Sequence, residues 1–160
     1  MKLLICVITS LFLSLSVHAQ IVGKIIFTKG RVVSINGNKE NIVKKGHQLK
    51  LGETIQTMAN ALAVIKLNDK STIKLDSKSK IKVSQIVSKL QPTEVELSIG
   101  SAFFNVLRKK QTQKKSEDLE KFKVKTRTAA MAVRGTTFFV AALDKAKSYD
   151  TWMCVKEGRV

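Results

Sequence analysis

Apolar and polar residues alternate along much of the chain after residue 20, which is the period of a β-strand with one buried face. The alternation is clearest in Ile81–Ser84, Glu94–Ile99 and Phe122–Thr126, and shorter runs occupy 63–67 and 72–76. The apolar set should line a core, and it consists of Ile65, Leu67, Ile73, Leu75, Ile81, Val83, Val95, Leu97, Phe122 and Val124. The polar set should face solvent, and it includes Lys66, Lys74, Lys82, Glu96 and Lys123.

Turn residues separate these runs. Glycine, asparagine and aspartate tolerate the positive φ angles of tight turns, and they occur at Lys29-Gly30, Asn36-Gly37-Asn38, Lys45-Gly46, Leu51-Gly52, Asn68-Asp69-Lys70 and Ile99-Gly100. Short strands at spacings of roughly ten residues are typical of sandwiches and related all-β folds. The pattern therefore predicts an all-β protein, either a twisted β-sandwich or a short β-solenoid-like domain.

Two segments depart from the alternation. In 101–106 the adjacent Phe103 and Phe104 cannot face the same side, so this segment is either a strand or a short buried turn. Segment 108–121 is dense in charge and has Leu119 as its one apolar residue. Because it can bury little surface, we expect a surface loop or an exposed helical turn there.

The first nineteen residues have the organisation of a secretory signal peptide. Met1-Lys2 is followed by an apolar run over 3–17, and Val17-His18-Ala19 places suitable residues at −3 and −1 of a cut between Ala19 and Gln20. The run is shorter than the about 20 residues that span a bilayer. We expect a signal peptide over 1–19, one domain over 20–160, and a periplasmic or secreted location. An uncleaved anchor or lipidation of Cys6 are the alternatives.

The formal net charge of +17 should attract anionic partners. For an exported protein these are lipid head groups, lipopolysaccharide phosphates, cell-wall polymers or acidic protein faces, and we expect no nucleic acid. The densest basic cluster is the candidate anion-binding site, formed by Arg108, Lys109, Lys110, Lys114 and Lys115. Glu117, Asp118 and Glu120 follow it and would neutralise it if they pair with it. Alternatively, lysine simply fills the solvent side of the strands.

Residues with catalytic or metal-binding chemistry are sparse after residue 19. His47 is the one histidine and Cys154 the one cysteine there, which makes no zinc site by spacing and no internal disulfide. No nucleophile motif or phosphate-binding loop occurs, and the carboxylates are mostly interleaved with lysines. We therefore expect no enzyme activity, no cofactor and no metal, and we expect Cys154 to be a buried small apolar residue.

Two blocks of residues resemble a known family. The first is Gly46-x-x-Leu49-x-x-Gly52-Glu53-x-Ile55-x-Thr57, followed by Ile65-x-Leu67-x-Asp69-x-Ser71. The second runs from Phe122-x-Val124-x-Thr126 to Val133-Arg134-Gly135-Thr136-Thr137-Phe138. In order and spacing they are similar to the FecR family, a periplasmic domain first met in a regulator of ferric citrate uptake. The residues that carry the motif, taken as structural, are Gly46, Leu49, Gly52, Thr57, Asp69, Thr126, Val133, Arg134, Gly135, Thr136 and Phe138.

Local chemistry suggests roles for some of these residues. Gly46 and Gly52 bracket a turn that should need positive φ, and Thr57 can bond its own backbone at a strand end. Arg134 is a guanidinium within the apolar stretch 129–143. A buried arginine requires a carboxylate or several carbonyls as partners, so we expect a structural clamp there, with ligand contact as the alternative.

The chain departs from the best-known FecR proteins, which carry a cytoplasmic anti-sigma segment and a membrane helix before this domain. Here a signal peptide precedes it directly, so control of a sigma factor does not carry over. The family pattern also runs on beyond Val160, which leaves open whether the domain is complete at its C-terminus. We expect a non-enzymatic periplasmic protein-interaction or signalling module whose partner is an envelope protein. The alternative is a cell-envelope polyanion binder that meets an anionic polymer or lipid surface with its lysines; the oligomeric state stays open.

Overall fold

The computed structural model of the chain describes residues 20–85, 92–107, 122–145 and 148–159, and within them it contains strands and turns but no helix. The strands, in chain order, are β1 (Ile21–Lys29), β2 (Val32–Asn36), β3 (Lys39–Ile42), β4 (Gln48–Lys50), β5 (Thr54–Thr57), β6 (Leu62–Leu67), β7 (Thr72–Leu75), β8 (Lys80–Gln85), β9 (Thr93–Asn105), β10 (Phe122–Lys125), β11 (Ala130–Lys145) and β12 (Ser148–Arg159). The all-β prediction is confirmed.

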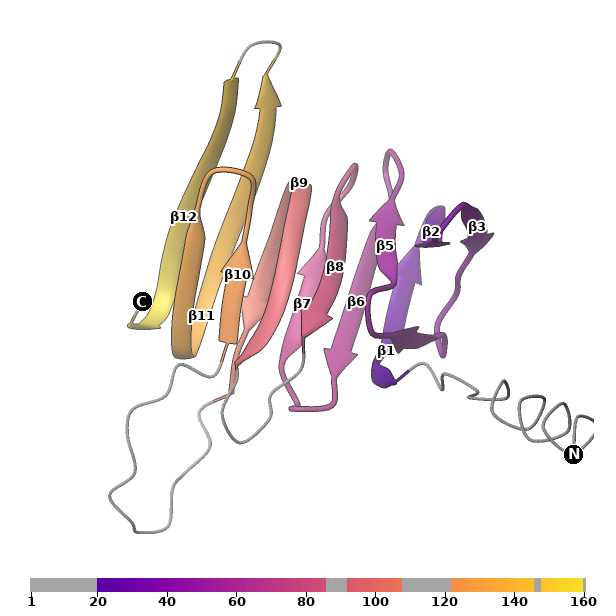
Figure 1. Cartoon of the computed structure of the whole chain (residues 1–160), viewed down its shortest axis with the longest axis horizontal. Helices are drawn as coiled ribbons and strands as arrows, with labels where there is room; N and C mark the ends of the chain where they lie inside the picture. Colours follow the sequence, from indigo (N-terminus) through magenta and orange to yellow (C-terminus); the bar gives the residue numbers. More distant parts are fainter. Residues whose placement is uncertain (1–19, 86–91, 108–121, 146–147, 160) are drawn as a thin grey trace, which may run out of the picture.

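The strands form two layers of one curled sheet. The first layer has the order β4-β1-β6-β7-β9-β11-β12, and the second has the order β3-β2-β5-β8-β9-β10-β11. Neighbours are antiparallel except β9 and β10, which are parallel. The strands stack along the long axis of the molecule, from β1–β3 at one end to β11–β12 at the other (Figure 1). This is a sandwich whose chain passes repeatedly between the layers.

The two long strands, β9 and β11, belong to both layers because each bends at a glycine. In β9, residues 94–99 pair with β8 and residues 102–105 with β7, and Gly100 between them has φ +89°. A Cβ on Gly100 would lie 2.2 Å from Ser79 Oγ, so no side chain fits there. In β11, Gly135 has φ +61° between residues 130–133, which pair with β10, and residues 137–142, which pair with β9. The prediction of a turn at Ile99-Gly100 was wrong, because the glycine bends a continuous strand instead.

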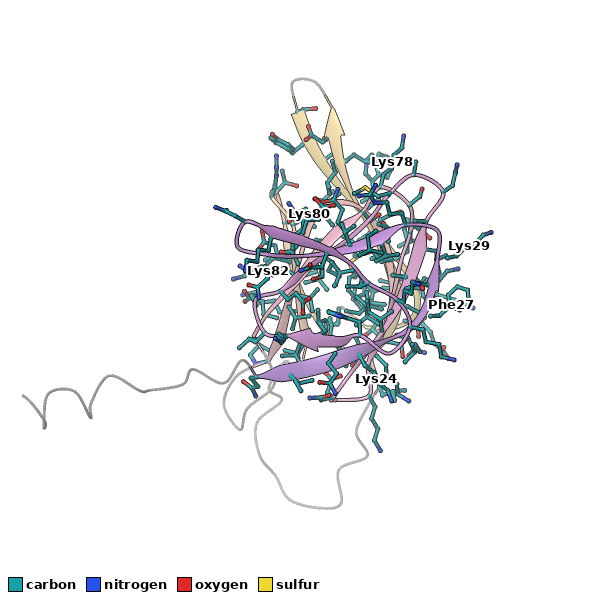
Figure 2. All side chains as sticks on the ribbon, turned by 90° about the vertical axis from the view of Figure 1, so that its right-hand side faces the viewer. Lys24, Phe27, Lys29, Lys78, Lys80 and Lys82 are labelled. Atoms are coloured by element: carbon teal, nitrogen blue, oxygen red, sulfur yellow. The ribbon has the colours of Figure 1, made fainter. Side chains whose placement is uncertain are left out.

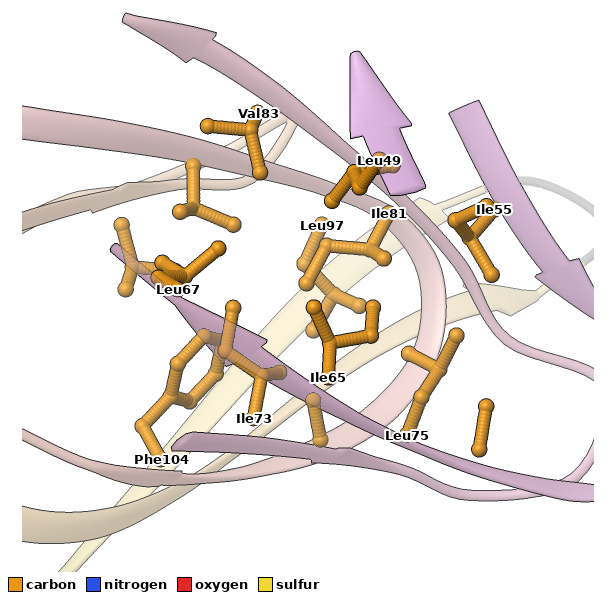
Figure 3. Packing of buried hydrophobic residues seen from close by; sticks show 14 of the residues in the cluster. Leu49, Ile55, Ile65, Leu67, Ile73, Leu75, Ile81, Val83, Leu97 and Phe104 are labelled. Carbon is orange, nitrogen blue, oxygen red and sulfur yellow. The ribbon is translucent and has the colours of Figure 1, made fainter. Parts of the chain in front are cut away.

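One apolar core fills the space between the layers, and all ten residues predicted for it are buried. Figure 3 shows side chains of both layers converging, with Ile65, Ile73 and Leu75 from the first layer and Ile55 and Ile81 from the second. Farther along, three phenylalanines meet across the layers. Phe104 stacks on Phe138 with ring centroids 5.0 Å apart, and Phe122 meets Phe104 edge-on at 6.1 Å.

The polar positions follow the prediction only in part. Lys66 and Lys74 are exposed as expected, but Lys82, Glu96 and Lys123 are half-buried. Lys82 and Glu96 are cross-strand neighbours, and a long charged side chain that lies along its neighbours loses part of its exposed area. Alternation therefore identified the correct face but not the depth of burial.

Candidate functional site

The first motif block closes one end of the core. Between β3 and β5 the chain crosses to the first layer and back, and on the way it forms β4, whose Leu49 is only 1% exposed. The turns on either side of β4 contain Gly46 (φ +96°) and Gly52 (φ +79°), so the predicted positive φ angles are confirmed. Val43, the first residue of this crossing, is also buried. We call this crossing, residues 43–53, the cap.

A buried carboxylate fixes the cap. Glu53 is 4% exposed, and its Oε2 accepts the backbone N–H of Lys50 at 2.8 Å while Oε1 lies 2.7 Å from His47 Nε2. Burial alone would raise the pKa of Glu53, but hydrogen bonds from the Lys50 backbone, the Ser34 hydroxyl and His47 outweigh burial and lower it. Glu53 is thus held as a carboxylate that links β2 to the cap, including its strand β4. Sequence reasoning matched Glu53 to the motif but did not assign it this role.

Thr57 and Asp69 act as local clamps between strands. The Thr57 hydroxyl donates to the carbonyl oxygen of Asp76 and accepts the backbone N–H of Ser79 at 3.0 Å. The prediction that Thr57 bonds its own backbone was wrong, because its partners lie in the turn before β8. Asp69 accepts the backbone N–H of Ser71 through Oδ1 and the hydroxyl of Thr93 through Oδ2. Each side chain therefore links its own segment to a strand or turn that is distant in the sequence.

The second motif block follows β10 and the bend of β11. Val133 and Phe138 face the core on either side of Gly135, and Thr136 is buried between them. Ahead of the bend, the Thr126 hydroxyl accepts the backbone N–H of Ala129 at 3.0 Å and lies 2.7 Å from the Thr151 hydroxyl, which links the turn before β11 to β12.

Two predicted features lie outside what the structure describes. The backbone of Arg134 lies in β11, but its side chain is outside the described residues, so the clamp stays a prediction. The basic cluster lies entirely within 108–121, a segment also outside the described residues. The candidate anion-binding role of this cluster likewise stays a prediction.

The lysines labelled in Figure 2 point in several directions rather than forming one patch. Viewed along the long axis from the β1–β3 end, Phe27 and Lys29 lie on one side, Lys80 and Lys82 on the other, and Lys24 below (Figure 2). On the outer face of the second layer, lysines also alternate with glutamates, and Lys125 Nζ lies 2.8 Å from Glu94 Oε1. The hydrogen bond from Lys125 is the largest effect on the pKa of Glu94, and together with the Ser84 hydroxyl it lowers this pKa against the opposing effect of burial.

The outer face of the first layer is different, because apolar side chains interrupt its polar residues. Phe27 and Trp152 are exposed, and Phe103 and Phe139 are half-buried. Cys154 is exposed on this face rather than buried, so that prediction was wrong; its register neighbour Phe139 points outward too. Sequence reasoning assigned no function to these residues, although it indicated that the adjacent Phe103 and Phe104 cannot face the same side.

Three kinds of feature are absent from the described residues. They contain no helix long and apolar enough to cross a membrane, and no group of histidine, cysteine, aspartate and glutamate side chains that could hold a metal ion. Their buried side-chain nitrogens and oxygens all have hydrogen-bond partners.

Comparison with known proteins identifies a family. The family model described as FecR protein matches residues 53–160, from the last residue of the cap through β12. The match includes the second motif block and begins after Gly46, Leu49 and Gly52. No curated protein and no solved structure matches the chain.

Proposed function

Because the chain belongs to the FecR family, we propose that it is an exported, non-enzymatic regulatory module that acts by binding a protein of the cell envelope. The observation that carries the proposal is the family match, because FecR proteins are signalling and regulatory modules. Export is supported by the signal-peptide organisation of residues 1–19.

The cap supports a role without catalysis. Its histidine and carboxylate lie beside a serine of β2, but the carboxylate is central and receives both the Ser34 hydroxyl and His47. In a catalytic triad the imidazole is central, since it must take the proton of the nucleophile. The three side chains are therefore arranged to stabilise the crossing of the chain.

The lysine arrangement favours a protein partner over a polyanion. An extended polymer of phosphates would be met best by one continuous basic face, whereas the labelled lysines in Figure 2 diverge around the molecule. Several lysines of the second layer also neighbour glutamates in register, as Lys82 neighbours Glu96.

Retention of envelope proteins at two salt concentrations tests the binding role. Extract from the envelope is passed over the immobilised protein at 0.1 M and 1 M salt, between which the Debye length shrinks from about 10 Å to about 3 Å. We expect one protein species to be retained at both, because an interface with an apolar centre resists screening. Retention that vanishes at high salt and is displaced by soluble polyphosphate would contradict the proposal and establish polyanion binding.

Export is tested separately by the N-terminus of the mature protein. If the signal peptide is cut between Ala19 and Gln20, mass spectrometry of the periplasmic fraction should find Gln20 first, free or cyclised to pyroglutamate. An intact Met1 in the cytoplasmic fraction would refute the proposed location.

A further inference from the structure

A single row of side chains crosses the outer face of the first layer from β1 to β12. Successive cross-strand neighbours in register are Phe27, Val64, Lys74, Phe103, Phe139 and Cys154. The next row along the same strands contains Ile65, Ile73, Phe104 and Phe138, all fully buried. Because side chains alternate between the faces of a sheet, the first row points away from the core. We call it the aromatic row.

The aromatic row is accessible to a partner. Phe27 is 49% exposed at one end and Cys154 is exposed at the other, with Phe103 and Phe139 half-buried between them. In the adjacent outward row, Trp152 is 65% exposed beside Ala141. Single exposed apolar residues are ordinary on protein surfaces, but an aligned series over one face marks an interaction site.

Charge divides this face into two halves. Lys24 and Lys66 are cross-strand neighbours on β1 and β6, and Lys74 lies within the aromatic row on β7. None of the three forms an ion pair with a described residue. Toward β12, the row that begins with Lys24 and Lys66 ends at Glu157. The β1–β7 half therefore carries the three lysines, and the aromatic row of the β9–β12 half carries no charge.

We infer that this face binds an amphipathic helix of a partner protein, with carboxylates over Lys24, Lys66 and Lys74 and apolar side chains over Phe103, Phe139 and Trp152. The inference rests on the proposed function, and it names the surface and the chemistry of the partner. The dimensions fit, since six strands at spacings of about 4.8 Å make a row of about 24 Å. A helix of about 16 residues has that length. Such interfaces usually have aromatic and other apolar residues at their centre and polar or charged residues at their rim.

The other occupants fit less well. A second copy of this chain would bring the same lysines against Lys24, Lys66 and Lys74, on a molecule of formal net charge +17. An anionic bilayer is broad and flat, so its phosphates would also meet Asp76 and Glu157, which lie on this face beside the row. A helix can place its carboxylates opposite the lysines alone.

The protein contains its own reporter for this face, because Trp152 is its one tryptophan. The probes are two tryptophan-free peptides of about 18 residues that share a leucine face and carry either glutamates or lysines on the polar face. Titration is followed by Trp152 emission and by anisotropy of the labelled peptide. We expect the glutamate peptide to bind and shift the Trp152 emission to shorter wavelength, and the lysine peptide to bind at least about tenfold more weakly.

Matched variants separate this face from net charge. Lys66→Gln with Lys74→Gln removes two charges from the first layer, and Lys80→Gln with Lys82→Gln removes two from the second. We expect the first pair to weaken binding of the glutamate peptide by about tenfold or more and the second by less than about threefold. Phe103→Ser should act like the first pair. Phe27→Ser, at a more exposed position, tests the same face if Phe103→Ser fails to fold.

Each contrary result overturns the inference. Equal weakening by both lysine pairs would mean that only net charge matters, and equal affinity for both peptides would mean unspecific apolar contact. Binding of phosphatidylglycerol vesicles with the same dependence on Phe27 and Lys74 would assign the face to lipid. If the glutamate peptide does not bind while an envelope protein is still retained at high salt, this inference fails and the proposed function stands.

Discussion

The two ends of the sandwich are built from different chemistry. At the β1–β5 end, the cap covers the core with Leu49 and is tied by the buried carboxylate of Glu53. At the β11–β12 end, Met131 and Met153 are only partly buried and Val155 is 41% exposed. The ion pair there joins Arg127 and Asp144 at 4.0 Å, and both side chains are about half exposed.

This difference separates residues that stabilise the fold from residues that are free to bind. A buried carboxylate with several donors is costly to disturb, because loss of any partner leaves a desolvated group unpaired. Half-exposed apolar residues and surface ion pairs contribute much less to folding. We therefore expect substitutions at the cap to lower stability, and substitutions near β12 to leave stability almost unchanged.

The largest loss of stability is expected for a substitution between the two ends, at the bend of β9. Gly100→Ala combines a positive φ with a Cβ 2.2 Å from Ser79 Oγ, and we expect a loss of about 3–5 kcal/mol from strain and overpacking together. The control Gly52→Ala has φ +79° and nothing within 4 Å of the added Cβ, so it should lose only about 1–2 kcal/mol. Thermal unfolding measures both, and similar losses would show that Ser79 moves aside.

The second prediction compares apolar truncations at the two ends. Leu49→Ala removes a side chain that is 1% exposed beneath the cap, and it should cost about 2–4 kcal/mol, which includes the cavity left behind. Val155→Ala, beside Phe138 on the core-facing side of β12 but 41% exposed, should cost less than about 1 kcal/mol. Urea unfolding gives the two values. Equal costs would mean that the β12 end is covered as well as the cap.

The third prediction uses acid to test the cap. The pKa of Glu53 in the folded protein is below its ordinary value of 4.5, so its stabilising effect is complete above that pH and is lost as pH falls through the folded value. Glu53→Gln should cost about 1–3 kcal/mol at neutral pH. Below pH 4.5, the free energy of unfolding of this variant should also fall less steeply than that of the unmodified chain.

Glu94→Gln is the control for the acid experiment. Its carboxylate also has a lowered pKa, but it pairs with the more exposed Lys125 at the surface of the second layer. We expect Glu94→Gln to change the free energy of unfolding less than Glu53→Gln does at neutral pH. We also expect it to alter the fall of stability at acid pH less. If the free energy of unfolding of Glu53→Gln falls with pH as steeply as that of the unmodified chain, carboxylates outside the cap determine acid unfolding.

Sequence periodicity predicted the inward faces of the strands because alternation depends only on local backbone geometry. It identified Phe122 and Val124 as core residues, and turn chemistry placed Gly46 and Gly52 at positive φ. It could not tell a turn from a bend at Gly100, since both need a positive φ and only the pairing of distant strands distinguishes them. That distinction decides which strands share a layer.

The aromatic row could not be predicted from the sequence, for a related reason. Phe27, Phe103 and Phe139 come from strands that are far apart in sequence, and the register that aligns them is a property of the assembled sheet. The apolar segment around Cys154 does not ensure burial, because β12 pairs only with β11 among the described strands and leaves Cys154 exposed. The role of Glu53 likewise depends on Ser34 and His47, which the crossing of the chain brings together.

The smallest change in stability is expected when the polar contacts at the β12 end are removed. Arg127 lies 4.4 Å from the centroid of the Tyr149 ring and 4.0 Å from Asp144, and all three side chains are substantially exposed. Solvent screens such contacts, and the long side chain loses rotamer freedom to make them. Arg127→Ala should therefore change the free energy of unfolding by less than about 1 kcal/mol, and added salt should reduce the difference further. Lys24→Ala, an exposed cation at the other end that makes no ion pair with a described residue, is the control. If Arg127→Ala instead costs as much as Glu53→Gln, the β12 end is held by polar contacts as firmly as the cap, and the contrast between the two ends fails.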